Sequence, residues 1–333
     1  ERCGRCCGGF GLSFAAFAVI ATIGTGSAVQ AAAISGIVTS SVPAIPAVAV
    51  GVVIVVAVAA VIFGGVNSIA RVCEWLVPIM AGAYALGCLV IMGMNAPVLG
   101  EAVGLILECA FTPKAAFGGA VGSGMVMALQ FGCARGLFSN ESGLGTAPIV
   151  AAAAKTKNPA DQALISMTGA FWSTGVICLL TGLVLVSTMI VHPEIGADIL
   201  ANPSIFTGAA LASAAFAEIP VFGTPVLVLG MCAFAYSTIL GWSYYGNRCV
   251  AYLFGPKGIK PYQVIYVAVG AIGVGDVVWT ISDIGNALMA IPNIIVILLL
   301  SGMIARETKH YVYDGHLDEE YAEPVPRVDK AQL

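Results

Sequence analysis

Three short stretches of the chain combine glycine with hydroxyl or amide side chains inside runs that carry no charge. Residues 23–30 read IGTGSAVQ, residues 117–124 read FGGAVGSG and residues 236–245 read YSTILGWSYY. Backbone carbonyls and hydroxyls of this kind suit hard cations such as sodium, and Ser237 and Thr238 offer two adjacent hydroxyls. Trp242 follows Thr238 by four residues, so on a helix the indole and the hydroxyl lie on the same face.

Helix packing is the alternative explanation for each stretch taken alone. Small residues let membrane helices approach closely, and Ser, Thr or Gln can hydrogen-bond across the interface. The combination favours a transporter, because secondary transporters bind solutes at broken helices near the bilayer midplane. The second stretch is predicted to unwind, since it holds four glycines, Gly118, Gly119, Gly122 and Gly124.

A fourth polar cluster follows an apolar run and holds Arg135, Asn140 and Glu141 in the sequence RGLFSNESGLG. It is either a cytoplasmic gate or a helix end closed by local hydrogen bonds and an Arg135–Glu141 ion pair. No HExxH, GxSxG or Walker pattern occurs, and the three histidines lie outside the apolar runs. We therefore expect no enzyme and no organic cofactor. A CxxCC cluster at Cys3, Cys6 and Cys7 lacks the further ligands that a tetrahedral zinc site needs.

The elements that must position these residues are membrane helices. The 333 residues are 59% hydrophobic and 10% charged, against about 25% charged in soluble domains. No charge occurs between Arg5 and Arg71, and six further runs are long enough for a span. We expect residues 1–9 to be an irregular edge, 10–306 a single membrane domain, and 307–333 a disordered cytoplasmic tail. About eight spans are predicted, near residues 10–35, 46–69, 75–95, 115–138, 163–190, 223–250, 261–280 and 284–305. Residues 98–112 and 197–216 are expected to form helices that lie at the interface or cap the outside instead.

The basic residues sort the loops into two sets. Successive spans cross the membrane in opposite directions, so successive loops lie on alternate sides. This places Arg71, Lys155, Lys257 and their basic neighbours on one side, and Lys114 as the one basic residue on the other. Because cytoplasmic loops are rich in Lys and Arg, both termini are predicted to be cytoplasmic. No basic patch indicates nucleic acid binding.

The sequence also resembles a known family at these residues. Residues 134–148, ARGLFSNESGLGTAP, resemble the signature of the alanine or glycine:cation symporter family, and residues 237–246, 278–283 and 289–293 look like family segments in family order. The resemblance extends from Phe10 to about Arg306. It implies an all-α membrane protein of LeuT type, in which two inverted five-helix repeats enclose a midplane site.

On that plan the spans look like helices three to ten, so the bundle lacks its first two helices. The resemblance implies that residues Gly24, Thr25, Gly26, Gln30, Thr238 and Trp242 line an amino acid pocket. Ser237 and Thr238 match hydroxyls near a sodium site, and the glycines from Gly118 to Gly124 match a helix break. Residues upstream of Glu1 are expected to encode two more helices, and Glu1–Leu333 alone is expected not to transport.

The sequence thus predicts sodium-coupled symport of alanine or glycine across a prokaryotic plasma membrane. A proton-coupled or exchanging carrier of the same fold is the alternative within transport. A non-transporting membrane scaffold or fragment is the alternative outside it.

Overall fold

The computed structural model describes residues 8–111, 141, 143–195, 208–271 and 276–320, and every regular element in these ranges is helical. This confirms an all-helical fold for the described part of the chain. The predicted span at 115–138, and with it the glycine-rich break, lies outside the described residues.

Five helices of the described part are long and apolar enough to cross a membrane: Gly8–Ser41, Val66–Met94, Pro159–Val191, Gly223–Phe254 and Trp279–Tyr313. A sixth apolar helix, α3 (Ala47–Ile62), has 16 residues. The last of the five exposes Ile294, Leu298 and Leu299. Large apolar side chains on an outer face are what a lipid environment favours. The sequence and the helices together indicate a multi-pass membrane protein.

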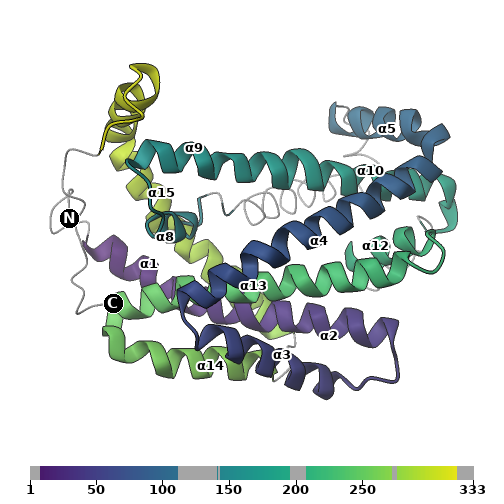
Figure 1. Ribbon diagram of the computed structural model, residues 1–333, viewed down its shortest axis with the longest axis horizontal. Helices are drawn as coiled ribbons and strands as arrows, with labels where there is room; N and C mark the ends of the chain where they lie inside the picture. The colour runs from purple at the N-terminus through teal and green to yellow at the C-terminus, as the bar shows by residue number, and fades with distance from the viewer. Residues whose placement is uncertain (1–7, 112–140, 142, 196–207, 272–275, 321–333) are drawn as a thin grey trace, which may run out of the picture. The chain divides into compact units, whose positions relative to one another are not determined.

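Two compact units divide the chain. The first comprises residues 1–74, 141–169 and 235–333, and the second comprises residues 75–140 and 170–234. The first unit contains the helix α1 (Gly8–Ala21), the π-helical turn η2 (Thr22–Ala28) and α2 (Val29–Ser41), which form one continuous rod. It also contains α14 (Ile259–Ala271), α15 (Asp276–Thr308) and the final turn η6 (Lys309–Tyr313). Figure 1 shows α3 and α14 side by side within this unit.

Turns between these helices follow local sequence. The rod ends at Ser41, and α3 starts after Pro46, whose extended backbone (ψ 143°) fits a residue that precedes a helix. The long helix α13 (Gly223–Phe254) ends at Gly255, which takes φ +75° and donates its N–H to the Ala251 carbonyl at 3.0 Å. Glycine suits this position because a left-handed φ costs it little.

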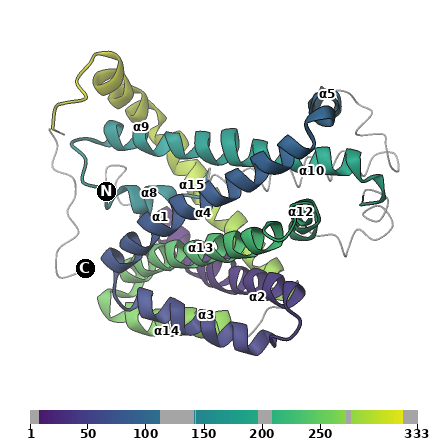
Figure 2. The same ribbon diagram turned by 45° about the vertical axis from the view of Figure 1, so that its right-hand side comes forward.

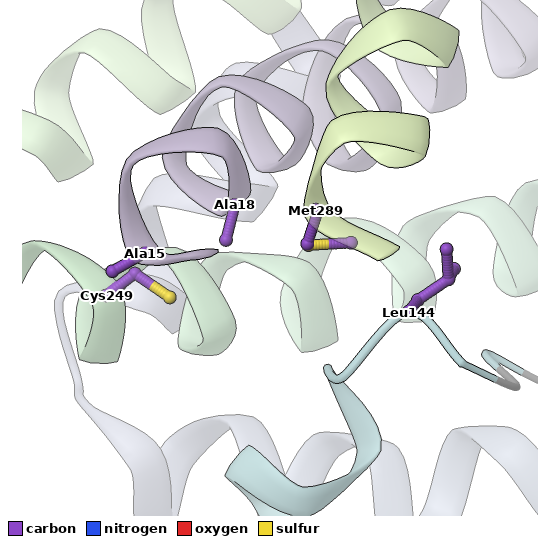
Figure 3. Close-up of a cluster of buried hydrophobic side chains, with 5 residues drawn as sticks. All are labelled: Ala15, Ala18, Leu144, Cys249 and Met289. Atoms are coloured by element: carbon purple, nitrogen blue, oxygen red, sulfur yellow. The ribbon is translucent and has the colours of Figure 1, made fainter. Parts of the chain in front are cut away.

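The core of the first unit lies where α1 packs along α15. Ala15 and Ala18 of α1 are small enough to let Met289 of α15 and Cys249 of α13 approach, and Leu144 closes the cluster from the loop (Figure 3). All five are buried. Small residues on one helix facing larger ones on its neighbours are typical of close membrane-helix packing.

The second unit is held by aromatic packing around Tyr84 of α4 (Val66–Met94). Its ring stacks on Phe216 of α12 (Gly208–Ala217) at 5.4 Å and meets Phe234 edge-on at 6.0 Å. The Tyr84 hydroxyl lies 2.8 Å from the Thr181 hydroxyl of α10 (Leu179–Val191). Figure 2 shows α5, α10 and α12 of this unit from a second side.

Short elements complete the chain. Residues 98–112, expected at the interface, form α5 (Leu99–Phe111) after the turn η3 (Ala96–Val98), and the described part of 197–216 lies in α12. The helix that ends in α10 begins with α9 (Pro159–Ala170) and a second π-helical turn, η4 (Phe171–Cys178). The remaining elements are α8 (Ala147–Ala151) and η5 (Pro256–Gly258).

Candidate functional site

The first polar stretch forms a π-helical turn inside the rod. The N–H of Val29 bonds to the carbonyl of Gly24, five residues back instead of four. Six of the seven η2 residues are buried, including Thr22, Thr25 and Ser27. π-turns within α-helices occur frequently at functional sites, because the widened turn shifts side chains and carbonyls out of the α-helical register.

Trp242 of α13 packs directly on this turn. A methyl group added at Gly26 would collide with Trp242 Cβ and lie 2.9 Å from the Tyr266 hydroxyl. Trp242 is 4% exposed, and its ring meets that of Tyr245 edge-on at 5.9 Å. The predicted site residues Gly26 and Trp242, 216 positions apart, are therefore in contact, and only glycine leaves room for the indole.

Tyr266 of α14 ties the turn to α13. Its hydroxyl donates to the Ile239 carbonyl at 2.8 Å, while its own carbonyl accepts a bond from the Ser27 hydroxyl at 2.7 Å. Both side chains are buried. These two bonds fix the rotation of η2 relative to the helix that carries Trp242.

Thr25 and Gln30 are joined to one another and to α15. The Gln30 side chain donates to the Thr25 carbonyl at 3.3 Å, and the Asn286 amide donates to the Thr25 hydroxyl at 2.9 Å. Gly24 lies against Ser282 of the same helix α15, since a methyl group there would collide with Ser282 Oγ. Gly24, Thr25 and Gly26 thus contact partners on α13, α14 and α15, whereas the Gln30 amide bonds within the rod.

The predicted sodium ligands lie on α13. Ser237 and Thr238 are both half-buried, four or five residues before Trp242, and both make interactions within the protein. Among the described residues no group of three or more His, Cys, Asp or Glu side chains could hold a metal ion. Cys3, Cys6 and Cys7 lie outside the described ranges.

Glu141 anchors the polar loop that the sequence singled out as a gate. One of its carboxylate oxygens accepts bonds from the Thr146 hydroxyl at 2.6 Å and the Tyr245 hydroxyl at 3.1 Å. Burial raises the pKa of the Glu141 carboxyl above its ordinary value, and the two hydroxyl donors oppose that rise. Arg135 and Asn140 lie outside the described residues, so the expected Arg135–Glu141 pair stays a prediction.

Two further contacts hold this loop against the helices. The Asn293 amide of α15 donates to the Gly143 carbonyl at 2.8 Å. Gly145 has φ +85° and lies so close to Phe14 and Asn293 that a methyl group would clash with both. Both glycines of the GLG motif have a positive φ that favours glycine, and close approach also excludes a side chain at Gly145.

Several contact residues escaped the sequence analysis. Ser282 and Asn286 are one helical turn apart on α15. Ser282 fell between the predicted spans 261–280 and 284–305 and Asn286 within the second, and neither was predicted to be a site residue. Two polar residues at i and i+4 next to apolar runs were a usable signal. Tyr266 gave no such signal, because a tyrosine in a span is ordinary and its partners come from distant segments.

Comparison with known proteins decides the family. Residues 5–323 match the model of the sodium:alanine symporter family. The chain belongs to that family. It is 46% identical over 257 residues to the sodium/alanine symporter AgcS of Methanococcus maripaludis, an alignment that covers 76% of this chain and 54% of that protein.

Two Bacillus proteins of the family are more distant. The chain is 32% identical over 256 residues to the probable sodium/glutamine symporter GlnT of Bacillus subtilis, covering 75% of this chain and 51% of that protein. It is 30% identical over 251 residues to the sodium/proton-dependent alanine carrier protein of Bacillus sp. strain PS3, covering 72% and 56%. The family resemblance inferred from residues 134–148 is confirmed, and the chain spans about half the length of these relatives.

Proposed function

We propose that the protein carrying this chain is a secondary active transporter that takes up alanine or glycine together with sodium. The observation that carries the proposal is the contact of Gly26 with Trp242, in a chain of the sodium:alanine symporter family. In this proposal the indole packed on the glycine-rich turn forms one wall of the site and limits the size of the substrate side chain. The names of AgcS and the PS3 carrier point to alanine.

Residue roles follow from this proposal. Gly24, Thr25, Gly26 and Gln30 present backbone groups and an amide to the substrate, while Thr238 and Trp242 form its opposite wall. Ser237 and Thr238 supply hydroxyl ligands to the coupling sodium ion. Gly118, Gly119, Gly122 and Gly124 form a helix break whose end dipole meets the substrate carboxylate.

The architecture we propose is a LeuT-type bundle of two inverted repeats, with residues 10–306 as its membrane domain. Loops rich in Lys and Arg, and both termini, face the cytoplasm of a prokaryotic cell, and Arg135, Asn140 and Glu141 form a gate on that side. Single cysteines introduced at Lys155 and Glu194 test the orientation: a membrane-impermeant thiol reagent added to intact cells should label the second and not the first. Labelling of both from outside contradicts the assignment.

Proton coupling is a second candidate, favoured by one specific feature. Glu141 is a partly buried carboxyl whose pKa is raised by burial, and one relative is named as a sodium/proton-dependent carrier. A carboxyl inside the protein that can take up and release a proton is a group that proton-coupled transport needs. Glutamine is a second candidate substrate, from the name of GlnT.

Uptake of radiolabelled alanine into proteoliposomes tests the proposal. The complete gene product is reconstituted, and an inward sodium gradient is compared with an equal potassium gradient and with a proton gradient. Accumulation driven by sodium supports the proposal, while accumulation driven by the proton gradient alone supports the alternative carrier. No accumulation of alanine, glycine or glutamine under any gradient identifies a non-transporting membrane protein.

A further inference from the structure

The amide of Asn286 has one end satisfied and one end without a partner. Its nitrogen donates to the Thr25 hydroxyl at 2.9 Å, but its oxygen Oδ1 is buried and accepts no hydrogen bond from the described residues. Asn286 is 8% exposed and Thr25 3% exposed. A buried polar atom left without a partner costs about 1–3 kcal/mol, so this oxygen needs a hydrogen-bond donor or a cation that the described residues do not supply.

The buried surroundings of Asn286 are rich in oxygen atoms, and the charged residue nearest to it along α15, Asp283, is exposed. Ser282 lies one turn earlier on the same face of α15, is 1% exposed and sits against Gly24 of the π-turn. The Thr25 hydroxyl keeps a second acceptor position beyond the one that Asn286 uses. No Lys or Arg occurs between Arg5 and Arg71, and the basic residue nearest to Asn286 on α15 is Arg306, twenty positions away.

The backbone is also displaced at this place. The Val29 N–H bonds to the Gly24 carbonyl, five residues back. Where the helix returns to α-helical bonds four residues back, one backbone carbonyl is left without a backbone N–H. The next carbonyl, that of Thr25, is the one that receives the Gln30 side chain. Gly285 lets α15 approach the start of the turn, because a methyl group at Gly285 would lie 3.3 Å from the Ala21 nitrogen. The first part of the turn, with Gly24 and Thr25, therefore lies directly against α15 at Ser282 and Asn286.

We propose that Asn286 Oδ1, with the hydroxyls of Thr25 and Ser282, binds a dehydrated monovalent cation at the π-turn, at a position separate from the Ser237–Thr238 pair on α13. Because Asn286 Oδ1 is an acceptor, its occupant must be a cation or a hydrogen-bond donor. No Lys or Arg lies near Asn286 along α15 or near Thr25 along the rod. Neutral oxygen ligands suit a singly charged hard ion, which carries little charge to desolvate compared with a divalent one. The inference rests on the proposed function only in the choice of sodium as the probe.

The test is direct binding, measured without alanine. The complete gene product is purified in detergent without sodium, and its thermal stability is followed as NaCl replaces choline chloride at constant ionic strength. An ion that binds only the folded protein raises the melting temperature in proportion to its occupancy. We expect Asn286→Leu to raise the half-saturating sodium concentration of this site about tenfold or more, in the range found when metal-site partners are removed.

Matched variants make the result specific. Asn293→Leu removes an amide of the same helix that bonds Gly143, so it should lower stability while keeping the sodium response. Ser237→Ala should remove only the separate response of the α13 site. Asn286→Asp should retain or tighten sodium binding, since a carboxylate oxygen replaces the amide oxygen.

The outcomes separate the two proposals. If Asn286→Leu keeps the wild-type sodium response, the occupant is an internal water and this inference is wrong, even where sodium drives alanine uptake. A wild-type protein with no sodium response also overturns it. If Asn286→Leu alone loses the high-affinity response in a protein that takes up no alanine, the cation site stands and the transport proposal fails.

Discussion

The two π-helical turns η2 and η4 have the same backbone irregularity in opposite surroundings. In η2 six of seven residues are buried, whereas the structure buries none of the eight residues of η4. Gly26 of η2 faces a buried tryptophan, while η4 carries Phe171 and Trp172, each 62% exposed. A π-turn alone therefore does not define a site. The candidate site arises where the widened turn meets glycines, buried polar side chains and an aromatic wall from another helix.

Substitution of Trp242 in α13 and of Trp172 in η4 should give the largest difference between the two regions. Trp242→Ala removes a buried indole that packs on Gly26, and we expect a loss of about 3–5 kcal/mol in stability, together with impaired uptake or relaxed size selectivity. Trp172→Ala in η4 should change stability by only about 0.5 kcal/mol. Thermal unfolding followed by size-exclusion chromatography, with uptake of alanine and of larger amino acids, measures both. Unchanged kinetics and selectivity in Trp242→Ala would count against its role.

Alanine substitutions of one glycine in each π-turn compare how closely η2 and η4 are packed. Gly26→Ala places a methyl group against Trp242 Cβ, which is fixed to the main chain, so we expect destabilisation of about 1–3 kcal/mol and loss of uptake. Gly175→Ala in η4 meets its nearest neighbour, Phe171 Cδ2, at 3.4 Å, which is ordinary contact. There alanine should be neutral or stabilise by up to about 1 kcal/mol. Equal effects of the two substitutions would show that the η2–Trp242 contact is unimportant.

Substitution of Glu141 should have the smallest effect on stability, and that effect should depend on pH. Its pKa in the folded protein is raised by burial, so its contribution to stability is fully present below its ordinary pKa and is lost as pH rises through the raised value. Glu141→Gln keeps an oxygen for the Thr146 and Tyr245 hydroxyls but cannot ionise. We expect the melting temperature of this variant to fall less with rising pH than that of the wild type.

The control for this pH series is Glu101→Gln, because Glu101 is exposed on α5. That variant should keep the wild-type pH slope. If Glu141→Gln also keeps it, the carboxyl does not titrate in the way that its burial predicts.

The helices and part of the candidate site could be predicted from patterns that are local in the sequence. Charge-free runs, which can be read directly along the chain, located most of the described helices, although α15 continues through residues 281–283, where two spans were expected to be separated. The residues Gly26 and Trp242 were singled out from spacing and from family resemblance. Their contact depends on a third helix, through the bonds of Tyr266 to Ser27 and Ile239, which no local pattern encodes. The π-turn itself was not predicted either, since glycine and threonine in a span fit an α-helix equally well.

Asn286 shows the same limit for the site. Its position in the sequence marks it as a polar residue in an apolar run, but its importance comes from the bond to Thr25 across 261 positions. Tertiary packing decided which oxygen received a donor and which did not.

Equilibrium binding of radiolabelled alanine to the purified complete gene product tests the central claim, that η2 and α13 form the amino acid site. The wild type should bind alanine in NaCl and much less in choline chloride. Trp242→Leu should weaken binding about tenfold or more, which corresponds to about 1.4 kcal/mol, while Trp172→Leu should bind as the wild type does. Wild-type affinity in a folded Trp242→Leu protein would contradict the account.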